Sequence, residues 1–396
     1  MTCRTRLAII ASHPIQYQTP WFRALAETPG VDLEVFFGHQ ATAAQQAGAG
    51  FGVPFEWDIP LLDGYSHSFL RNVAAAPSLA SFRGIDTPEI ADVVARGHFD
   101  ALIVHGWQFK NAWQAIVACW RTGTPVMVRG DSHLHSPRAA ATKIAKWPLY
   151  RAFMPRFDAC LAAGTWSRDY FLHYGAPAGR VFVVPHVIDL DRFGAEAARL
   201  RPLRHELRRK WALDESAVVA LFVGKFLERK RPMDFIAAVE RVSSVNRRVM
   251  GLMVGDGPLR AACETRVVQR QVPIRFAGFL NQAEIVQAYV AADVLVLPSD
   301  GRETWGLVVN EAMAVGCPAI VTDAVGCGPD LVDPGRTGAR VPLGDVEGLA
   351  RAIDEWSDAR TLQSARPHLE DKVTTFSPAR AVERTLVAVT TVRRER

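Results

Sequence analysis

Short apolar runs recur along the chain and are separated by stretches with helical periodicity. The runs expected to be strands lie at residues 7–12, 33–37, 101–105, 125–129, 159–163 and 181–185 in the first half, and at 218–224, 250–255, 274–278, 294–298 and 319–322 in the second. Because they are nearly continuous in Val, Ile and Leu, they are typical of strands buried on both faces of a parallel sheet.

Helical periodicity fills the intervals between these runs. We expect helices at residues 21–27, 111–121, 167–174, 233–245, 284–292, 309–315 and 347–357. Strands that alternate with helices predict an α/β fold, and the pattern occurs twice. We therefore predict two doubly wound, Rossmann-like domains that face each other across an interdomain cleft, with ligands bound beyond the carboxyl ends of the strands.

The domain boundary is expected at a stretch that is rich in Arg and Ala and poor in strand-forming residues. It covers residues 194–215, which we interpret as a linker. An N-terminal domain at 1–193 and a C-terminal domain at 216–375 remain, followed by a helix within 376–396. Residues 41–98 lack clear periodicity. Long loops explain them most simply, and an irregular insertion that lines the cleft is the alternative.

The composition supports a globular protein of this kind. Of 396 residues, 49% are hydrophobic and 22% charged, and 46 Lys and Arg against 41 Asp and Glu give a net charge of +5. These values exclude disordered, collagen-like and coiled-coil classes, and the length exceeds that of one ordinary core. Because the charge is evenly mixed, no nucleic-acid partner is expected.

The cysteines and the apolar runs bear on compartment. Six cysteines are scattered without a C-x-x-C pair or zinc-ligand spacing, so we expect reduced thiols and no metal site. The apolar run at residues 7–11 is too short for the core of a signal peptide. No run of about 18 apolar residues occurs, so no transmembrane helix is expected. We therefore expect a cytoplasmic protein.

Residues 298–318 carry the most specific chemical signal. They are expected to run from a strand through a loop into a helix that ends at Gly316. The unpaired N–H groups at the helix start near Gly306 favour an anion, and Gly306 lets a phosphate approach the backbone. Glu303 precedes this helix and Glu311 lies within it. Since carboxylates accept hydrogen bonds from vicinal hydroxyls, this arrangement predicts a ligand with a central diphosphate and hydroxyls at both ends, such as a nucleotide sugar.

Glu303 and Glu311 form an E-x7-E motif, and the chain from Glu311 onwards reads E-A-M-A-V-G-C-P-A-I-V. This segment resembles the E-x7-E motif of the retaining GT-B glycosyltransferases of family 4. Further matching segments occur in the family's order at residues 222–226, 230–232, 254–258 and 276–279, and residues 184–193 resemble the family's hinge motif V-P-N-G-V-D-x-x-x-F. The ordered set covers nearly the whole chain and is far more specific than E-x7-E alone.

The resemblance implies a retaining GT-B transferase that moves a sugar from a nucleotide-diphosphate sugar to a hydroxyl acceptor. The acceptor would be a glycan, a lipid-linked glycan or a small natural product. The resemblance also implies a front-face reaction without a metal or other cofactor. The N-terminal domain would bind the acceptor and the C-terminal domain the donor, and the last helix would cross back onto the first domain.

The resemblance assigns roles to residues of the C-terminal domain. Lys225, where the family usually has Arg, and Lys230 would neutralise the departing diphosphate, and Glu303 would hold hydroxyls of the transferred sugar. Glu311 would hold the ribose. The implied donor-binding residues are Gly224, Gly255, Gly257, Phe279, Thr304, Gly306, Leu307 and Glu311.

The N-terminal domain departs from the family pattern. Its first strand–helix loop contains His13 and Gln16 in place of paired glycines, and both are candidate substrate contacts. A structural role for His13 is an equal alternative. Asp131 falls at the family's histidine position after the strand at 125–129, and His133 lies two residues beyond, so we expect the two jointly at the reaction site. Trp107 is a candidate for stacking on a sugar, although most tryptophans here are expected in the core.

Two other functions share part of this signal. A nucleotide-sugar 2-epimerase of similar fold would convert the donor without an acceptor, and an inactive partner protein would bind the donor without turnover. The E-x7-E set argues against the first, and the retained lysines and glutamates argue against the second.

The stretch at residues 138–156 has five basic residues and no acidic one, interleaved with Ile144, Trp147 and Phe153. This pattern predicts peripheral contact with an anionic membrane, although a solvated amphipathic helix explains it equally well.

Overall fold

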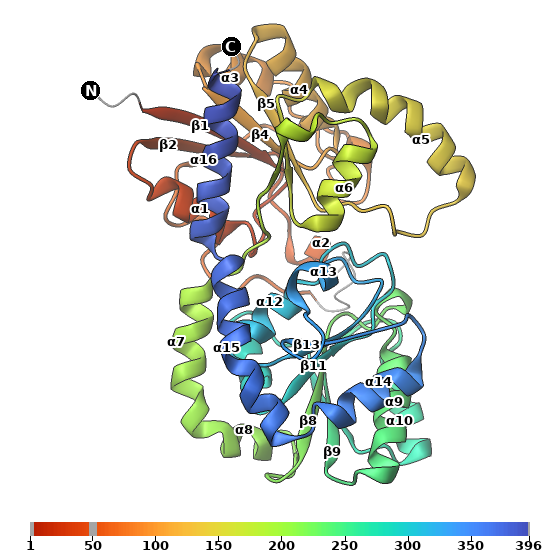
Figure 1. Cartoon of the computed structure of the whole chain (residues 1–396). Helices are drawn as coiled ribbons and strands as arrows, with labels where there is room; N and C mark the ends of the chain where they lie inside the picture. The colour runs from red at the N-terminus through yellow and green to blue at the C-terminus, as the bar shows by residue number, and fades with distance from the viewer. Residues whose placement is uncertain (1–3, 47–53, 395–396) are drawn as a thin grey trace.

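The computed structural model describes residues 4–46 and 54–394, and the strands within these ranges form two parallel sheets (Figure 1). The first sheet contains seven strands in these ranges and the second contains six. The fold class predicted from the sequence, two doubly wound α/β domains, is confirmed.

The first sheet is built from the N-terminal half. Its strands are β1 (Thr5–Ala11), β2 (Val31–Phe37), β3 (His67–Phe69), β4 (Ala101–His105), β5 (Val126–Gly130), β6 (Ala159–Ala162) and β7 (Val181–Val183). They lie side by side in the order β3-β2-β1-β4-β5-β6-β7. The direction in which successive strands are added to the sheet reverses between β1 and β4. Doubly wound folds bind ligands at the carboxyl ends of the strands at such a point.

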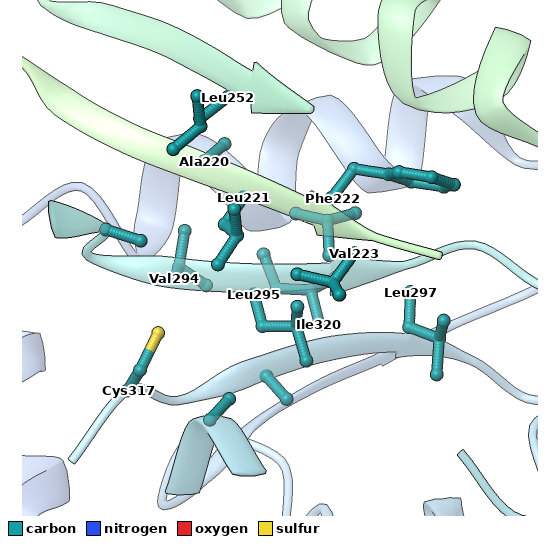
Figure 2. Packing of buried hydrophobic residues seen from close by; sticks show 14 of the residues in the cluster. Ala220, Leu221, Phe222, Val223, Leu252, Val294, Leu295, Leu297, Cys317 and Ile320 are labelled. Carbon is teal, nitrogen blue, oxygen red and sulfur yellow. The ribbon is translucent and has the colours of Figure 1, made fainter. Parts of the chain in front are cut away.

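The second sheet repeats this topology. Its strands are β8 (Val218–Val223), β9 (Val249–Val254), β10 (Ile274–Gly278), β11 (Val294–Leu297), β12 (Ala319–Thr322) and β13 (Gly338–Val341), in the order β10-β9-β8-β11-β12-β13. Side chains of the central strands pack closely, among them Leu221 of β8, Leu252 of β9 and Leu295 of β11 (Figure 2). The reversal point lies between β8 and β11.

Helices cover both faces of the sheets. They are α1 (Thr19–Ala26), α2 (Ala43–Gln46), α3 (Ile90–Gly97), α4 (Lys110–Thr122), α5 (Ala140–Phe153), α6 (Thr165–His173), α7 (Leu190–Leu200), α8 (Arg204–Lys210), α9 (Pro232–Val245), α10 (Arg260–Arg270), α11 (Ile285–Ala291), α12 (Leu307–Ala314), α13 (Gly328–Leu331), α14 (Val346–Glu355), α15 (Ala359–Thr375) and α16 (Pro378–Arg394). In β1, Leu7 and Ile9 pack with α1 and α16 on one face, while Ala8 and Ile10 pack with α3 and α4 on the other.

Residues 194–215, expected to be a linker, are mostly helical. They contain most of α7 and all of α8, and Ala197, Leu200, Leu207 and Trp211 are buried in the core of the second sheet. Because these apolar residues recur with amphipathic helical spacing, they pack together into the core of the second sheet. The segment therefore belongs to the C-terminal domain.

The C-terminal helix α16 lies against the first domain, although the preceding helix α15 lies on the second (Figure 1). Trp21 of α1 donates a hydrogen bond from Nε1 to Thr385 Oγ1 of α16 at 3.2 Å, and both residues are buried. The last part of the chain therefore ties the two domains together.

Part of the stretch at 41–98 reaches the second domain. The rings of Phe55 and Phe279 lie 4.9 Å apart between centroids, and Asn281 Nδ2 donates to the Glu56 carbonyl at 2.7 Å. Trp57 lines the cleft between the domains. Residues 54–66 form no helix or strand, as the prediction of loops requires, and Trp57 also lines the cleft, as in the alternative; residues 47–53 of this stretch lie outside the described residues.

The remaining differences from the sequence expectations are small. The edge strands β3 and β13 were not expected, since each is short and carries few apolar residues. The described residues contain no helix that is both long and apolar enough to cross a membrane. The cysteines Cys119, Cys160, Cys263, Cys317 and Cys327 are buried free thiols, and Cys3 lies outside the described residues.

Candidate active site

A deep cleft lies between the carboxyl ends of the two sheets. Residues of the N-terminal domain that line it are Gln16, Tyr17, Trp57, Asp131 and His186. Residues of the C-terminal domain that line it include Gly224, Lys225, Arg229, Lys230, Gly255, Phe279, Glu303, Thr304, Gly306, Leu307 and Glu311. Both walls therefore place polar and charged groups at the switch points of their sheets.

Three cations gather on the C-terminal wall. Lys225 follows β8, and Arg229 and Lys230 lie in the adjacent 3-10 turn Glu228–Lys230. Burial lowers the pKa of Lys225 to about 8, and the charges of Arg229 and Lys230 add to this shift. A site that lowers the pKa of a lysine by burial and by neighbouring cations favours an anionic ligand.

Lys230 forms a partly buried ion pair with Glu303. Glu303 lies in the loop between β11 and α12, so the pair joins two loops at the mouth of the cleft. It fixes the carboxylate beside the cations. The Glu303 carboxylate keeps further lone pairs that can accept hydrogen bonds from ligand hydroxyls.

The helix α12 begins at Leu307, directly after Gly306, as the sequence predicted. Gly306 has a φ of +105°, and a Cβ there would come 2.9 Å from a methyl carbon of Leu297. Glycine is therefore required to start the helix at this angle. The start of α12 lines the same cleft as the three cations, and the unpaired N–H groups of a helix start favour an anion.

Glu311, one turn into α12, is deeply placed. It is 7% exposed, and the hydroxyl of Tyr289 donates to its Oε2 at 2.6 Å. Burial raises the pKa of Glu311, while Tyr289, Gln282 and Arg192 oppose this. The hydrogen bond from Tyr289 orients the carboxylate in the cleft.

Asp131 dominates the N-terminal wall. It follows β5, accepts a hydrogen bond from the Thr304 hydroxyl at 2.7 Å, and lies 3.8 Å from His186 Nε2. Burial alone would raise the pKa of Asp131, but His186 and Thr304 hold it well below its usual range. Burial lowers the pKa of His186, against the influence of Asp131. At neutral pH the cleft therefore contains a carboxylate beside a neutral imidazole.

Most of the site residues predicted from the sequence lie in this cleft, and four of them do not line it. His133 lines a separate cavity beside helix α5. The ring of His13 hydrogen-bonds Ser12 Oγ at 3.0 Å, and burial lowers its pKa to about 4. Trp107 donates to the Tyr150 hydroxyl at 3.1 Å and packs on the core of the first domain. Gly257 faces the backbone of Phe226, where a Cβ would come within 2.9 Å.

Other cleft residues were missed by the sequence reasoning. His186 stands where the resembled hinge motif has Asn, and this departure was a signal that could have revealed it. Arg229 adjoins Lys230 and could have been found from the same segment. Tyr17 and Trp57 carry no local motif, and only the packing of the two domains brings them to the cleft.

The described residues, 4–46 and 54–394, contain no group of three or more His, Cys, Asp or Glu side chains placed to hold a metal ion. The independence of the reaction from metal stays a prediction.

Two family models match the chain. The model for glycosyl transferases group 1 matches residues 204–368, and the model for glycosyltransferase family 4 matches residues 23–192. The first covers most of the C-terminal domain and the second most of the N-terminal domain.

Characterised relatives are similar over part of their length. A GDP-mannose-dependent alpha-mannosyltransferase from Mycobacterium tuberculosis is 32% identical over 52% of this chain and 50% of its own. A 2-deoxystreptamine glucosyltransferase from Streptomyces kanamyceticus is 33% identical over 54% of this chain and 53% of its own. A D-inositol 3-phosphate glycosyltransferase from Streptomyces avermitilis is 29% identical over 69% of this chain and 62% of its own. The chain thus spans about half to three fifths of the length of these relatives.

Solved structures share the fold. A glycosyltransferase from Rickettsia africae superimposes with a TM-score of 0.74 at 15% identity, over 98% of each chain. HepE from Anabaena, in complex with UDP, superimposes with a TM-score of 0.71 at 16% identity, over 98% of this chain and all of its own. With both domains matched by family models and the two-sheet architecture shared with these structures, the chain belongs to the GT-B glycosyltransferases of the family 4 type.

Proposed function

We propose that the protein is a retaining glycosyltransferase that moves a sugar from a nucleotide-diphosphate sugar to a hydroxyl acceptor. One observation carries this proposal. Lys225, Arg229, Lys230 and the start of α12 line one cleft, together with Glu303 and Glu311. The cations and helix N–H groups match a diphosphate, and the two carboxylates match the hydroxyls of a sugar and a ribose.

The relatives support a nucleotide sugar as the donor. The Mycobacterium relative is named for GDP-mannose, and HepE has a structure with UDP-glucose. These names differ in base and sugar. Thermal-shift measurements with UDP, GDP, ADP and TDP would identify the base, and stabilisation by none of them would contradict the proposal.

The cleft suits a front-face reaction. The bond between the sugar carbon and the phosphate oxygen breaks, and the acceptor oxygen forms the new bond on the same face. The acceptor proton passes to the leaving phosphate oxygen, whose charge is stabilised by Lys225, Lys230 and the helix N–H groups. Asp131, kept ionised by Thr304 and His186, lies on the opposite wall, where it can orient the acceptor hydroxyl and stabilise the positive charge that develops on the sugar. We propose that the reaction needs no metal and no bound cofactor.

The test is transfer of a labelled sugar to an acceptor panel once the base is known, with NMR of the product. The expected product keeps the anomeric configuration of the donor. An epimerised nucleotide sugar formed without acceptor would instead indicate the 2-epimerase, and donor binding without turnover would indicate the inactive partner.

We further propose that the enzyme contacts an anionic membrane from the cytoplasmic side through α5. This helix extends away from the first domain (Figure 1), and Ile144 is 73% and Leu149 63% exposed among basic residues. An apolar stripe flanked by Lys and Arg is suited to the interface of an anionic bilayer. Co-sedimentation with liposomes should fall when phosphatidylglycerol is replaced by phosphatidylcholine, and unchanged binding would contradict the contact.

A further inference from the structure

A second cavity lies in the N-terminal domain between α5 and α6, outside the cleft described above. The residues that line it are His133, Leu134, Ser136, Arg138, Lys143, Ile144, Lys146, Trp147, Tyr170, His173 and Tyr174. α5 projects from the domain and α6 lies beside it (Figure 1), so the cavity is a groove open to solvent along α5. We refer to it below as the α5–α6 groove.

The α5–α6 groove combines an apolar surface with a basic rim. Ile144 and Trp147 of α5 are exposed large apolar residues, and they line the groove together with Tyr170 of α6 and Tyr174, which directly follows α6. The largest apolar patches on a soluble protein are often functional when they line a groove. Here the patch is continuous with charged groups of a single sign.

The basic rim is formed by Arg138, Lys143 and Lys146. The Lys146 ammonium hydrogen-bonds the Tyr170 hydroxyl and lies 4.2 Å from the centre of the Tyr150 ring. Within residues 4–46 and 54–394, none of the three forms an ion pair with an acidic side chain. A rim with uncompensated positive charge attracts an anionic group.

His133 lies at the inner end of the groove. It is 3% exposed, and the backbone of Glu303 opposes the lowering of its pKa by burial. The ring lies beside Trp166 in a tilted arrangement, with 5.2 Å between centroids. The imidazole therefore places a polar group on the wall of a cavity that is otherwise lined largely by apolar and basic side chains.

The inner end of the groove adjoins the reaction site. Asp131, two residues before His133, lines the interdomain cleft, and the His133 ring lies near the backbone of Glu303. The cavity and the cleft are thus separated by the loop that carries Asp131 and His133.

We propose that the α5–α6 groove is the subsite for an anionic amphiphilic acceptor. Its apolar chain lies against Ile144, Trp147 and the two tyrosines, its phosphate lies at Arg138 and Lys143, and a hydroxyl or sugar beyond the phosphate passes His133 towards Asp131. This inference rests on the proposed function, since it names the class of acceptor for the same reaction. It selects a lipid-linked acceptor over a free polysaccharide or a small neutral one.

The probe is dodecyl phosphate below its micelle concentration, titrated calorimetrically against the full chain. Dodecyl maltoside serves as the neutral amphiphile and inorganic phosphate as the anion without a chain. Wild-type protein is expected to bind dodecyl phosphate more tightly than either. Lys143→Glu should weaken dodecyl phosphate about tenfold and remove the preference over the maltoside, and Ile144→Glu should weaken both amphiphiles.

The matched control is Val245→Glu, which places the same charge at an 80% exposed position of the C-terminal domain and should leave both affinities unchanged. Circular dichroism and the thermal shift with a nucleoside diphosphate should be unchanged in all three variants. With an acceptor that carries a phosphate-linked chain, Lys143→Glu and Ile144→Glu should raise KM and leave kcat unchanged.

Three results would each overturn the proposal. The first is dodecyl phosphate binding that neither substitution alters. The second is inorganic phosphate binding as tightly as dodecyl phosphate, which would indicate an anion site without an amphiphile. The third is loss of phosphatidylglycerol vesicle binding in Lys143→Glu and Ile144→Glu while both variants bind monomeric dodecyl phosphate as tightly as wild type, which would make the surface a membrane contact only. Absence of nucleotide binding in wild-type protein would contradict the proposed function instead.

Discussion

Thr304 donates a hydrogen bond from Oγ1 to Asp131 Oδ2 at 2.7 Å, across the cleft between the two domains. The two residues are 173 positions apart, and each lies at the carboxyl end of its own sheet. The contact therefore joins the loop that precedes α12 to the carboxylate of the opposite wall. It is one of the contacts that lower the pKa of Asp131.

Thr304→Val is expected to raise the pKa of Asp131, because it removes one of the groups that stabilise the charged form. The acid limb of the kcat/KM profile should move up by about one pH unit, the size expected for one hydrogen bond to a charged group. Since the folded-state pKa is lowered, the ionised carboxylate stabilises the fold above its unfolded pKa, and this stability is lost as the pH falls through the folded value. Thr304→Ser keeps the hydroxyl and should retain the wild-type profile. Identical profiles for wild type and Thr304→Val would show that the Asp131 charge is not used.

The lowered pKa of Lys225, about 8, predicts a basic limb for diphosphate binding. Because burial disfavours the charged form of Lys225 in the folded protein, the free energy of unfolding is reduced below pH 8. This reduction disappears as the pH rises towards the ordinary pKa of lysine. Affinity for the nucleoside diphosphate identified by thermal shift should fall between pH 8 and 10, because the neutral amine no longer attracts phosphate.

The control for this prediction is Lys225→Arg, which stays charged over the whole range and should bind independently of pH. Calorimetric titration at pH 7, 8, 9 and 10 measures both proteins. A wild-type affinity that is flat over this range would contradict a role for the Lys225 charge.

Glu303→Gln is expected to lower kcat/KM for sugar transfer by about 10²–10³-fold, because it removes the carboxylate that binds the sugar hydroxyls and leaves Lys230 without its ion-pair partner. Lys230→Ala should lower kcat/KM by a similar factor, because it removes a charge that stabilises the departing diphosphate. Both variants should fold, since the pair lies at the cleft. The control is Glu370→Gln on the exposed side of α15, with activity as in wild type. Full turnover by Glu303→Gln would contradict the assignment.

Gly255→Ala is expected to destabilise the fold and the donor site together. Gly255 has a φ of +126°, and a Cβ there would come 2.0 Å from the carbonyl oxygen of Gly224. Backbone must shift to relieve this contact, so the free energy of unfolding should fall by about 2–4 kcal/mol. Gly179→Ala, where no atom lies within 4 Å, should change it by no more than about 1 kcal/mol. Equal urea midpoints for the two variants would contradict this.

The local pattern predicted most of the fold. Runs such as 218–224 became β8 because a strand that is buried on both faces must be apolar at every position, and that requirement is visible in sequence. The edge strands β3 and β13 escaped detection, because an edge strand is short and needs fewer apolar residues. Residues 194–215 are rich in Arg and Ala and poor in strand-forming residues, which predicts a linker, but their apolar side chains are buried because the second sheet is there to receive them.

By itself, the sequence determined most of the C-terminal wall of the cleft. Lys225, Lys230, Gly306 and Glu311 each belong to a strand–loop–helix segment whose geometry is set by neighbours in the chain, so a motif can reveal them. The N-terminal wall depended more on the tertiary structure, although Asp131 and Gln16 on it were predicted. Trp57 enters the cleft and the Thr304–Asp131 bond forms only through the packing of the two domains, and such contacts between distant segments leave no regular spacing in the sequence. His133 lines a separate groove because of the packing of segments within the N-terminal domain.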